Sequence, residues 1–156
     1  MKAVVQRVID ASVTVNGAFI GGISFGLLVY LGVAHDDTPR DADWLVEKIP
    51  HLRIFDDNEG KMNLSFMDIV NQQNREVNAL PVGVLAISQF TLLGDARKGR
   101  RPSWGKAAPP EKARELYRYF IEKMSEKIPC ASGEFQTHMK VSYTNDGPVT
   151  ILLDTA

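Results

Sequence analysis

The sequence has 156 residues, of which 44% are hydrophobic and 24% charged, and its formal net charge is −1. These values are typical of a globular domain with a substantial core. The single cysteine, Cys130, excludes a disulfide framework and a thiolate zinc site. The near-neutral charge excludes a surface that is basic throughout, so a nucleic-acid site would have to be a local patch.

The hydrophobic segments are short. The longest apolar run, residues 25–34, has ten residues, and a membrane-spanning helix needs about 20. Residues 1–7 become polar too early for a signal peptide. One cysteine fits a reducing compartment. We therefore expect a cytoplasmic protein that does not bind to membranes.

The first part of the chain predicts strands. Residues 3–8 favour a strand, and residues 11–15 and 18–20 flank Asn16-Gly17, the strongest short signal for a β-hairpin. The mostly apolar residues 25–33 predict a central strand.

A helix is predicted to begin at Thr38. Thr38 can cap it, Pro39 suits the first helical position, and Asp41 stands where a capping box has its acid. Apolar residues recur at helical spacing until Pro50, which ends or kinks the helix. Residues 52–55 then predict a strand and residues 56–60 a polar turn. Residues 68–80 predict a polar loop.

The next strand ends in polar residues. Residues 82–87 predict a buried strand, and Ser88, Gln89, Phe90 and Thr91 follow it. Side chains alternate along a strand, so we expect Ser88 and Phe90 to share one face and Gln89 and Thr91 the other. Hydrogen-bonding groups at the end of a core strand suit a binding site. They equally suit the satisfaction of backbone groups at a strand end, and the residues alone leave both interpretations open.

A basic segment follows this strand. Residues 96–106 contain five basic residues and no acid. Such a segment is usually a solvated loop, but the nearby Trp104 makes a phosphate-binding loop a reasonable hypothesis. The candidate phosphate contacts are Arg97, Lys98, Arg100 and Arg101.

The C-terminal third predicts one helix and two strands. After Pro109-Pro110, apolar residues form one helical stripe that ends at Ile128. Residues 139–143 and 149–153 predict two strands joined by a turn at 145–148. Strands with two intervening helices indicate an α+β fold, in one domain over residues 1–156.

Common catalytic motifs are missing from the sequence. The three histidines, His35, His51 and His138, have no metal-ligand spacing, so we expect no metal site. Ser88 is not in a G-x-S-x-G elbow, and Cys130 has no motif partner.

Two segments carry a family resemblance. Residues 88–92 (SQFTL) and 145–150 (NDGPVT) resemble the two signature motifs of the D-aminoacyl-tRNA deacylases. Shorter matches to this family occur at residues 1–8, 11–15, 53–55, 60–63, 99–102, 133–135 and 139–141. Residues 134–138 depart from it, because bulkier residues replace the small ones that often follow Phe135.

The resemblance implies a β/β/α layered fold with barrel-like sheets and two main helices, in a cytosolic homodimer. It implies hydrolysis of the ester between a D-amino acid and the 3′-terminal adenosine of tRNA, without a metal or organic cofactor. The active site would lie at the dimer interface. One subunit would supply Ser88, Gln89, Phe90 and Thr91, and the other Gly147 and Pro148 in the cis form. Arg7 would support the Gly-Pro turn, and Phe135 and Met139 would line the pocket.

A mechanism follows as a hypothesis. An aminoacyl ester is already activated, so positioning and anion stabilisation suffice. Backbone N–H groups near Phe90 and Thr91 would polarise the carbonyl, and Ser88 and Gln89 would orient groups by hydrogen bonds. Thr91 and the substrate's own ribose 2′-hydroxyl would position water or the attacking oxygen. Thr91 has no visible base partner, so we expect it to orient rather than attack.

Selection of the D-enantiomer would come from the rigid Gly147-Pro148 backbone, which can hold the α-ammonium while crowding one side of the Cα. A glycyl ester has no side chain to reject, so some hydrolysis of glycine mischarged on tRNA-Ala is expected. Two alternatives stay open. One is a relative with a trans Gly-Pro that clears L-alanine or other mischarged tRNA. The other is a non-catalytic nucleic-acid-binding module.

Overall fold

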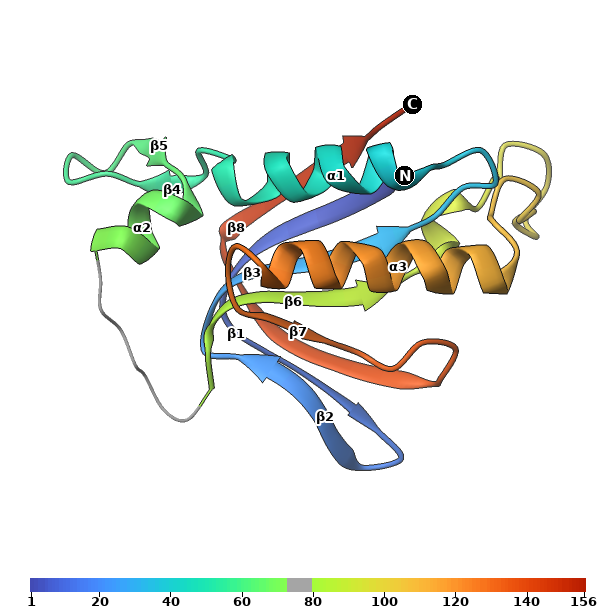
Figure 1. Ribbon diagram of the computed structural model, residues 1–156, viewed down its shortest axis with the longest axis horizontal. Helices are drawn as coiled ribbons and strands as arrows, with labels where there is room; N and C mark the ends of the chain where they lie inside the picture. The colour runs from blue at the N-terminus through green and yellow to red at the C-terminus, as the bar shows by residue number, and fades with distance from the viewer. Residues whose placement is uncertain (73–79) are drawn as a thin grey trace.

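The computed structural model describes residues 1–72 and 80–156. Strands contribute more residues to the fold than helices do, and two longer helices lie on one side of them (Figure 1). The strands are β1 (Lys2–Val15), β2 (Ala18–Ile23), β3 (Phe25–Gly32), β4 (Phe55–Asp56), β5 (Met62–Leu64), β6 (Val82–Ser88), β7 (Cys130–Ser132) and β8 (Met139–Asp154). The helices are α1 (Pro39–Lys48), α2 (Phe66–Gln72), α3 (Pro110–Ser125) and the 3₁₀ helices η1 (Ile49–His51) and η2 (Phe90–Leu93).

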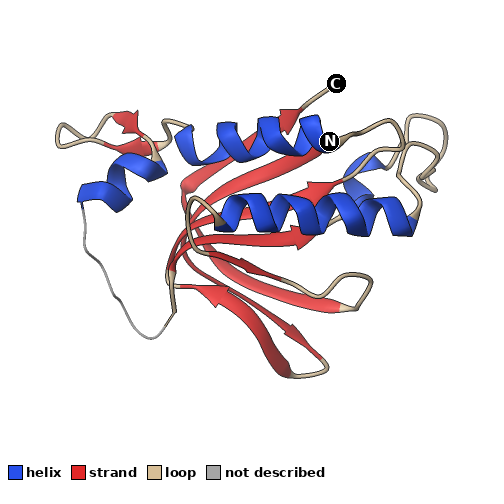
Figure 2. Cartoon of the chain, in the orientation of Figure 1, coloured by secondary structure: helices blue, strands red, loops and turns tan. Residues whose placement is uncertain are grey.

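Six strands form one mixed sheet in the order β2-β1-β3-β6-β7, with β8 paired to β1. The β3–β6 and β6–β7 pairs are parallel, and the others are antiparallel. β1 pairs with β3 through its first half and with β2 through its second half, so the sheet curves strongly (Figure 2). The strands at the two ends of this order, β2 and β7, lie close together. A Cβ on Gly21 of β2 would lie 2.8 Å from the carbonyl oxygen of Ser132 in β7. The sheet is therefore nearly barrel-shaped, as expected.

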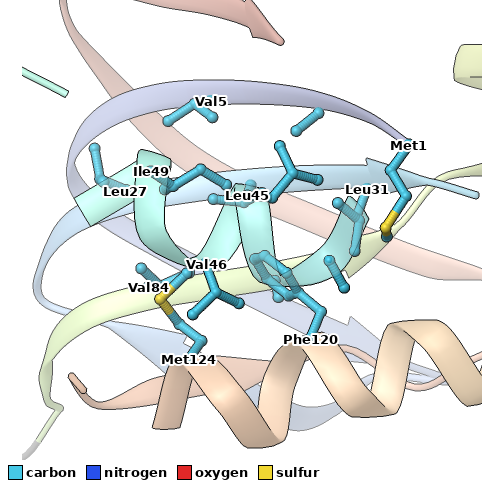
Figure 3. Close-up of a cluster of buried hydrophobic side chains, with 14 of the residues drawn as sticks. Met1, Val5, Leu27, Leu31, Leu45, Val46, Ile49, Val84, Phe120 and Met124 are labelled. Carbon is cyan, nitrogen blue, oxygen red and sulfur yellow. The ribbon is translucent and has the colours of Figure 1, made fainter. Parts of the chain in front are cut away.

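The central strands β3 and β6 are buried on both faces. One face packs against α1 and α3, where Leu27, Leu31 and Val84 meet Leu45 and Phe120 (Figure 3). The opposite face fills the curved sheet with Val8, Ala11, Val13, Ile23, Leu28, Leu85 and Ile87. Burial on both faces explains why these parallel strands are almost continuously apolar in sequence.

Several predicted boundaries are confirmed. Asn16 and Gly17 have φ values of 51° and 81°, as a tight hairpin between β1 and β2 requires. α1 begins after Thr38, whose N–H donates to Asp41 Oδ2 at 2.8 Å. It ends as η1 begins, and Pro50 lies in η1. Most of the predicted apolar stripe is buried on α3, at Leu116, Tyr117, Phe120 and Met124, but the helix ends at Ser125, so Ile128 lies beyond it.

Two predictions for the middle of the chain are wrong. The predicted strand at 52–55 is reduced to β4, because only Phe55 and Asp56 find partners in β5. The predicted loop at 68–80 is helical in α2 as far as residue 72, and residues 73–79 lie outside the described residues. Ser65 and Asp68 form a capping box that stabilises the start of α2, with Ser65 N–H donating to Asp68 Oδ2 at 2.8 Å.

The predicted C-terminal hairpin is also wrong. Residues 139–154 form the single strand β8, which pairs antiparallel with β1 from Met139↔Val15 to Asp154↔Lys2. Both halves of β8 run in one direction because β1 offers a continuous edge of 14 residues. The Gly147-Pro148 segment lies within β8, beside irregularities in its pairing with β1, and not in a reversing turn. The short strand β7, which extends the sheet beyond β6, was not predicted.

Candidate functional site

A pocket of about 480 Å³ opens at the C-terminal end of β6. Its walls come from β3 and β6, the start of α3 with the residues before it, and the segment that enters β8. It is mostly apolar, with a small number of polar groups, as is usual for small-molecule sites. The lining residues are Leu31, Val33, Ile87, Ser88, Gln89, Phe90, Ala107, Ala108, Pro110, Ala113, Phe135, Gln136, Thr137, His138, Met139 and Val141.

The chain turns sharply where β6 reaches this pocket. Ser88 is the last strand residue, and the Gln89 N–H still donates to the Leu31 carbonyl at 2.8 Å. Gln89 then leaves the extended conformation with ψ 81°, and Phe90 begins η2. The predicted alternation of faces from Ser88 to Thr91 is therefore wrong, since local bonds such as Gly94 N–H to the Thr91 carbonyl replace strand pairing.

Two backbone donors are free at the start of η2. The first bond of η2 runs from Leu92 N–H to the Gln89 carbonyl at 3.3 Å. The N–H groups of Phe90 and Thr91 precede this bond, as the first donors of any helix do. Neither has an acceptor within residues 1–72 and 80–156. Thr91 is exposed, and its Oγ1 accepts a hydrogen bond from Gln89 Nε2.

An exposed aromatic side chain stands at the mouth of the pocket. Phe90 is 55% exposed, and its ring meets Trp104 edge-on with 5.2 Å between centroids. Trp104 also covers Gly94, where a Cβ would lie 2.6 Å from the indole ring. The absence of a side chain at Gly94 therefore lets Trp104 pack beside η2.

Met139 lines the pocket and packs against Gly133. A Cβ on Gly133 would lie 2.5 Å from Met139 Sδ and 3.1 Å from Ile87 Cδ1. Gly133 is itself held by β6, because its N–H donates to the Ala86 carbonyl at 3.0 Å. The Tyr117 hydroxyl donates to the same carbonyl at 2.9 Å, and burial raises the pKa of this phenol above its usual value.

Arg7 lies beside the second signature motif. Its side chain is buried, and Nη1 donates to the Ile54 carbonyl at 2.8 Å. Its Nε lies 2.9 Å from Asp146 Oδ2, a charge contact without the alignment of a hydrogen bond. The peptide bond between Gly147 and Pro148 is cis, and Gly147 has φ +114°, a conformation that favours glycine.

Within one chain the two motifs do not come together. Gly147 and Pro148 are exposed and take no part in lining the pocket. In the described part of the chain, the pocket receives Ser88, Gln89 and Phe90 from the first motif. Their meeting with the second motif therefore stays a prediction about two subunits.

The basic segment is a loop whose two ends are joined by backbone hydrogen bonds. Asp95 and Ser103 exchange two backbone hydrogen bonds of 2.9 Å each. Asp95 also holds Arg97, whose Nε donates to Oδ1 at 2.9 Å and to Oδ2 at 3.0 Å. Hydrogen bonds from Arg97 lower the pKa of Asp95 well below its usual range. Arg97 is thus already paired, whereas Lys98, Arg100 and Arg101 are exposed at the loop tip.

Several lining residues were not predicted. Pro110 and Ala113 come from the first turn of α3, and Gln136, Thr137 and His138 come from the segment before β8. The sequence marked residues 134–138 only as a bulky departure from the family pattern. Nothing in the local pattern indicated that α3 forms a wall of the pocket.

Neither a metal cluster nor a membrane-spanning helix is found in the part of the chain that the structure describes. No three histidine, cysteine or acidic residues among 1–72 and 80–156 are placed to hold a metal ion. In the same residues, no helix is both long and apolar enough to cross a bilayer.

Comparison with known proteins decides the family. The family model described as D-Tyr-tRNA(Tyr) deacylase matches residues 4–154. This chain belongs to that family. A relative from Kosmotoga olearia, named D-aminoacyl-tRNA deacylase, is 56% identical over 154 residues, covering 99% of this chain and 97% of the relative. Deacylases of this kind are hydrolases of aminoacyl-tRNA ester bonds, and the resemblance to the D-aminoacyl-tRNA deacylases that the sequence indicated is confirmed.

Solved structures agree with this assignment at the level of the fold. A structure named "c-Myc DNA Unwinding Element Binding Protein" matches with a TM-score of 0.86 and 39% identity, covering 100% of this chain and 99% of that chain. A second, named as a probable eukaryotic D-amino acid tRNA deacylase, matches with a TM-score of 0.77 and 16% identity, covering 97% of each chain. The second likeness concerns the fold alone.

Proposed function

We propose that this protein hydrolyses the ester bond of D-aminoacyl-tRNA in the cytoplasm, releasing the D-amino acid and tRNA as a proofreading step of translation. The observation that carries the proposal is the pocket at the end of β6, which is lined by Ser88, Gln89 and Phe90. Phe90 and the next residue, Thr91, carry two free backbone N–H donors. The names of relatives at 50–56% identity support the same reaction.

The chemistry needs only a small set of groups. The free N–H groups of Phe90 and Thr91 stabilise negative charge as it develops on the ester carbonyl oxygen. Gln89 orients Thr91 through the hydrogen bond from its side chain to Thr91 Oγ1. Thr91 in turn orients water or the ribose 2′-hydroxyl. Ser88 orients the ester by hydrogen bonding.

Thr91 acts as an orienting group in this proposal. A nucleophilic hydroxyl requires a neighbouring base, and the hydrogen-bond partner of Thr91 is an amide. Thr91→Ala should therefore slow the reaction without abolishing it. Complete loss of activity, together with an acyl group trapped on Thr91 in the native protein, would assign the nucleophile to Thr91.

Selection against L-amino acids is assigned to a second subunit. In a homodimer, the exposed Gly147 and Pro148 of one protomer enter the pocket of its partner and hold the substrate α-ammonium by their carbonyl groups. Arg7 supports this segment through Asp146, and Phe135 and Met139 line the pocket that receives the adenosine end. Glycyl-tRNA, having no side chain to exclude, is hydrolysed as well.

The tRNA is bound through the tip of the basic loop. Lys98, Arg100 and Arg101 are the proposed phosphate contacts, since counterion release by exposed cations drives such binding. Arg97 belongs to the sequence-predicted set, but its pairing with Asp95 makes it the weakest candidate in the loop.

The test is a rate comparison with the purified protein. D-tyrosyl-, L-tyrosyl- and glycyl-tRNA are incubated with and without a chelator. Rapid loss of the D-tyrosyl and glycyl esters, unchanged by the chelator, is expected. Equal rates for the D and L esters would contradict the proposed selection, and loss of only L-alanyl or other L esters would favour the alternative deacylase of mischarged tRNA.

A second candidate is a nucleic-acid-binding module without catalysis. It is favoured by the 39% identity to a structure named as a DNA unwinding element binding protein, and by the exposed cations of the basic loop. If no ester were lost while tRNA or DNA still bound, this candidate would replace the first.

A further inference from the structure

We propose that Arg114 on α3 is a positioning residue that fixes the pocket wall at Phe135 and Gln136 for binding of the aminoacyl-adenosine end. This inference rests on the proposed deacylase function for its substrate. Arg114 itself does not line the pocket, so its effect on the substrate passes through the two residues that do.

The wall contains a backbone conformation that needs support. Gln136 has φ +63°, in the left-handed region that side-chain-bearing residues rarely adopt. Such a residue persists only when its surroundings hold it in place. Gln136 lies next to Phe135 in the wall, so a relaxed backbone here would move both side chains away from the pocket.

Arg114 makes two contacts that hold this segment. Its Nη2 donates to Gln136 Oε1 at 2.7 Å, and its guanidinium carbon lies 5.3 Å from the centre of the Phe135 ring. The Tyr117 ring packs against the same phenylalanine, with 6.0 Å between centroids. The Thr137 hydroxyl adds a local bond to the Glu134 carbonyl at 2.8 Å.

The helix that carries Arg114 is a firm support. On α3, Leu116, Tyr117 and Phe120 are buried in the main core, and Ala113, the neighbour of Arg114, lines the pocket. Arg114 therefore connects a helix anchored in the core to the irregular segment before β8 that forms one wall of the pocket. A planar guanidinium can donate a hydrogen bond and lie over a ring at once.

The first experiment measures steady-state kinetics with D-tyrosyl-tRNA. Arg114→Met should raise KM roughly two- to tenfold, the range for loss of a single hydrogen bond, with kcat changed less than about twofold. Arg114→Lys, which retains a donor but not the planar group, should recover part of the loss. Arg118→Met is the matched control, because Arg118 is an exposed arginine one turn further along α3.

A double-mutant cycle tests the route through Gln136. Glycine adopts positive φ without a steric penalty, so Arg114→Met should raise KM much less in a Gln136→Gly background. An equal rise in both backgrounds would overturn this route. A KM for Arg114→Met equal to that of Arg118→Met, or a fall in kcat alone, would overturn the positioning role itself.

Hydrogen exchange separates this proposal from the proposed function. In the wild-type background, Arg114→Met should speed amide exchange at residues 135–138 relative to Arg118→Met. Unchanged exchange would overturn the proposal even if the enzyme is active. If the wild-type protein hydrolyses no D-aminoacyl ester, the deacylase proposal fails, and the exchange result still decides whether Arg114 holds the wall.

Discussion

Arg7 offers the sharpest test of how β1 supports the second signature motif. We consider Arg7→Met, which keeps much of the aliphatic length of the side chain and removes its charge. Four interactions are lost: the hydrogen bond to the Ile54 carbonyl, the charge contacts with Asp146 and Asp56, and the guanidinium contact with the Phe55 ring at 6.0 Å. The Ile54 carbonyl is then left without its donor in a buried position.

The expected destabilisation can be estimated from these contacts. A hydrogen bond from a charged group contributes about 1.5–3 kcal/mol, and a cation–π contact about 0.5–1 kcal/mol. The Asp146 and Asp56 side chains are 42% and 53% exposed, so each ion pair adds less than about 1 kcal/mol. Part of this sum is offset because the charge no longer has to be buried. The net loss should be about 2–4 kcal/mol, which lowers Tm by about 10 °C in a domain of this size.

Thermal unfolding measured by circular dichroism at one matched protein concentration provides the assay. The control is Lys2→Met, which removes another ion pair from β1. Lys2 and Asp154 are 3.5 Å apart, and their side chains are 45% and 47% exposed, so this variant should lose less than about 1 kcal/mol. If the two variants melted within about 2 °C of each other, the reasoning from burial at Arg7 would be refuted.

Three further predictions concern the pocket and the basic loop. Gly133→Ala should displace Met139, whose sulfur would lie 2.5 Å from the added Cβ. Because this sulfur is near the end of a flexible side chain, the variant should lose at most about 1 kcal/mol in unfolding free energy. It should raise KM for D-tyrosyl-tRNA, and an unchanged KM would contradict the role of this wall. Arg100→Met should reduce the slope of log K against the logarithm of the salt concentration for tRNA binding by about 0.7–0.9, while Arg97→Met leaves this slope unchanged. Equal slopes for the two variants would remove the distinction between paired and free cations. Asp95 should remain ionised at about pH 3 in an NMR titration and should titrate near its usual pKa of about 3.9 in Arg97→Met. Because the folded-state pKa of Asp95 is depressed, its stabilisation of the fold is present above the unfolded-state pKa and is lost only as the pH falls through the folded-state value. An unshifted titration of Asp95 in the native protein would show that Arg97 does not hold this carboxylate.

The main elements of the fold could be predicted where a short segment contains the whole signal. Asn16-Gly17 favours a tight turn in any context, and Thr38 and Asp41 define a helix start by contacts three residues apart. The apolar stripe that ends near Ile128 fits only a helix packed on a core. Each of these depends on local backbone preferences or on a repeat visible within about 20 residues.

The functional segments were found by their residue types, but their shapes were not predicted. Ser88, Gln89 and Phe90 do line a pocket, yet the strand ends at Ser88. The turn into η2 depends on the hydrogen bond to the Leu31 carbonyl and on the packing of Trp104 over Gly94. Leu31 belongs to β3 and Trp104 to the basic loop, so neither contact can be read from the sequence of β6.

The sequence alone determined the turn at Asn16-Gly17, the two main helices, the buried central strands and the family. Only the tertiary structure decided that residues 139–154 form one strand, because that outcome depends on pairing with β1, more than 120 residues away. It also decided that Arg114 and Gln136 meet at the pocket wall. Long-range pairing selects among local conformations of similar free energy, so the sequence pattern of one segment cannot reveal which of them is formed.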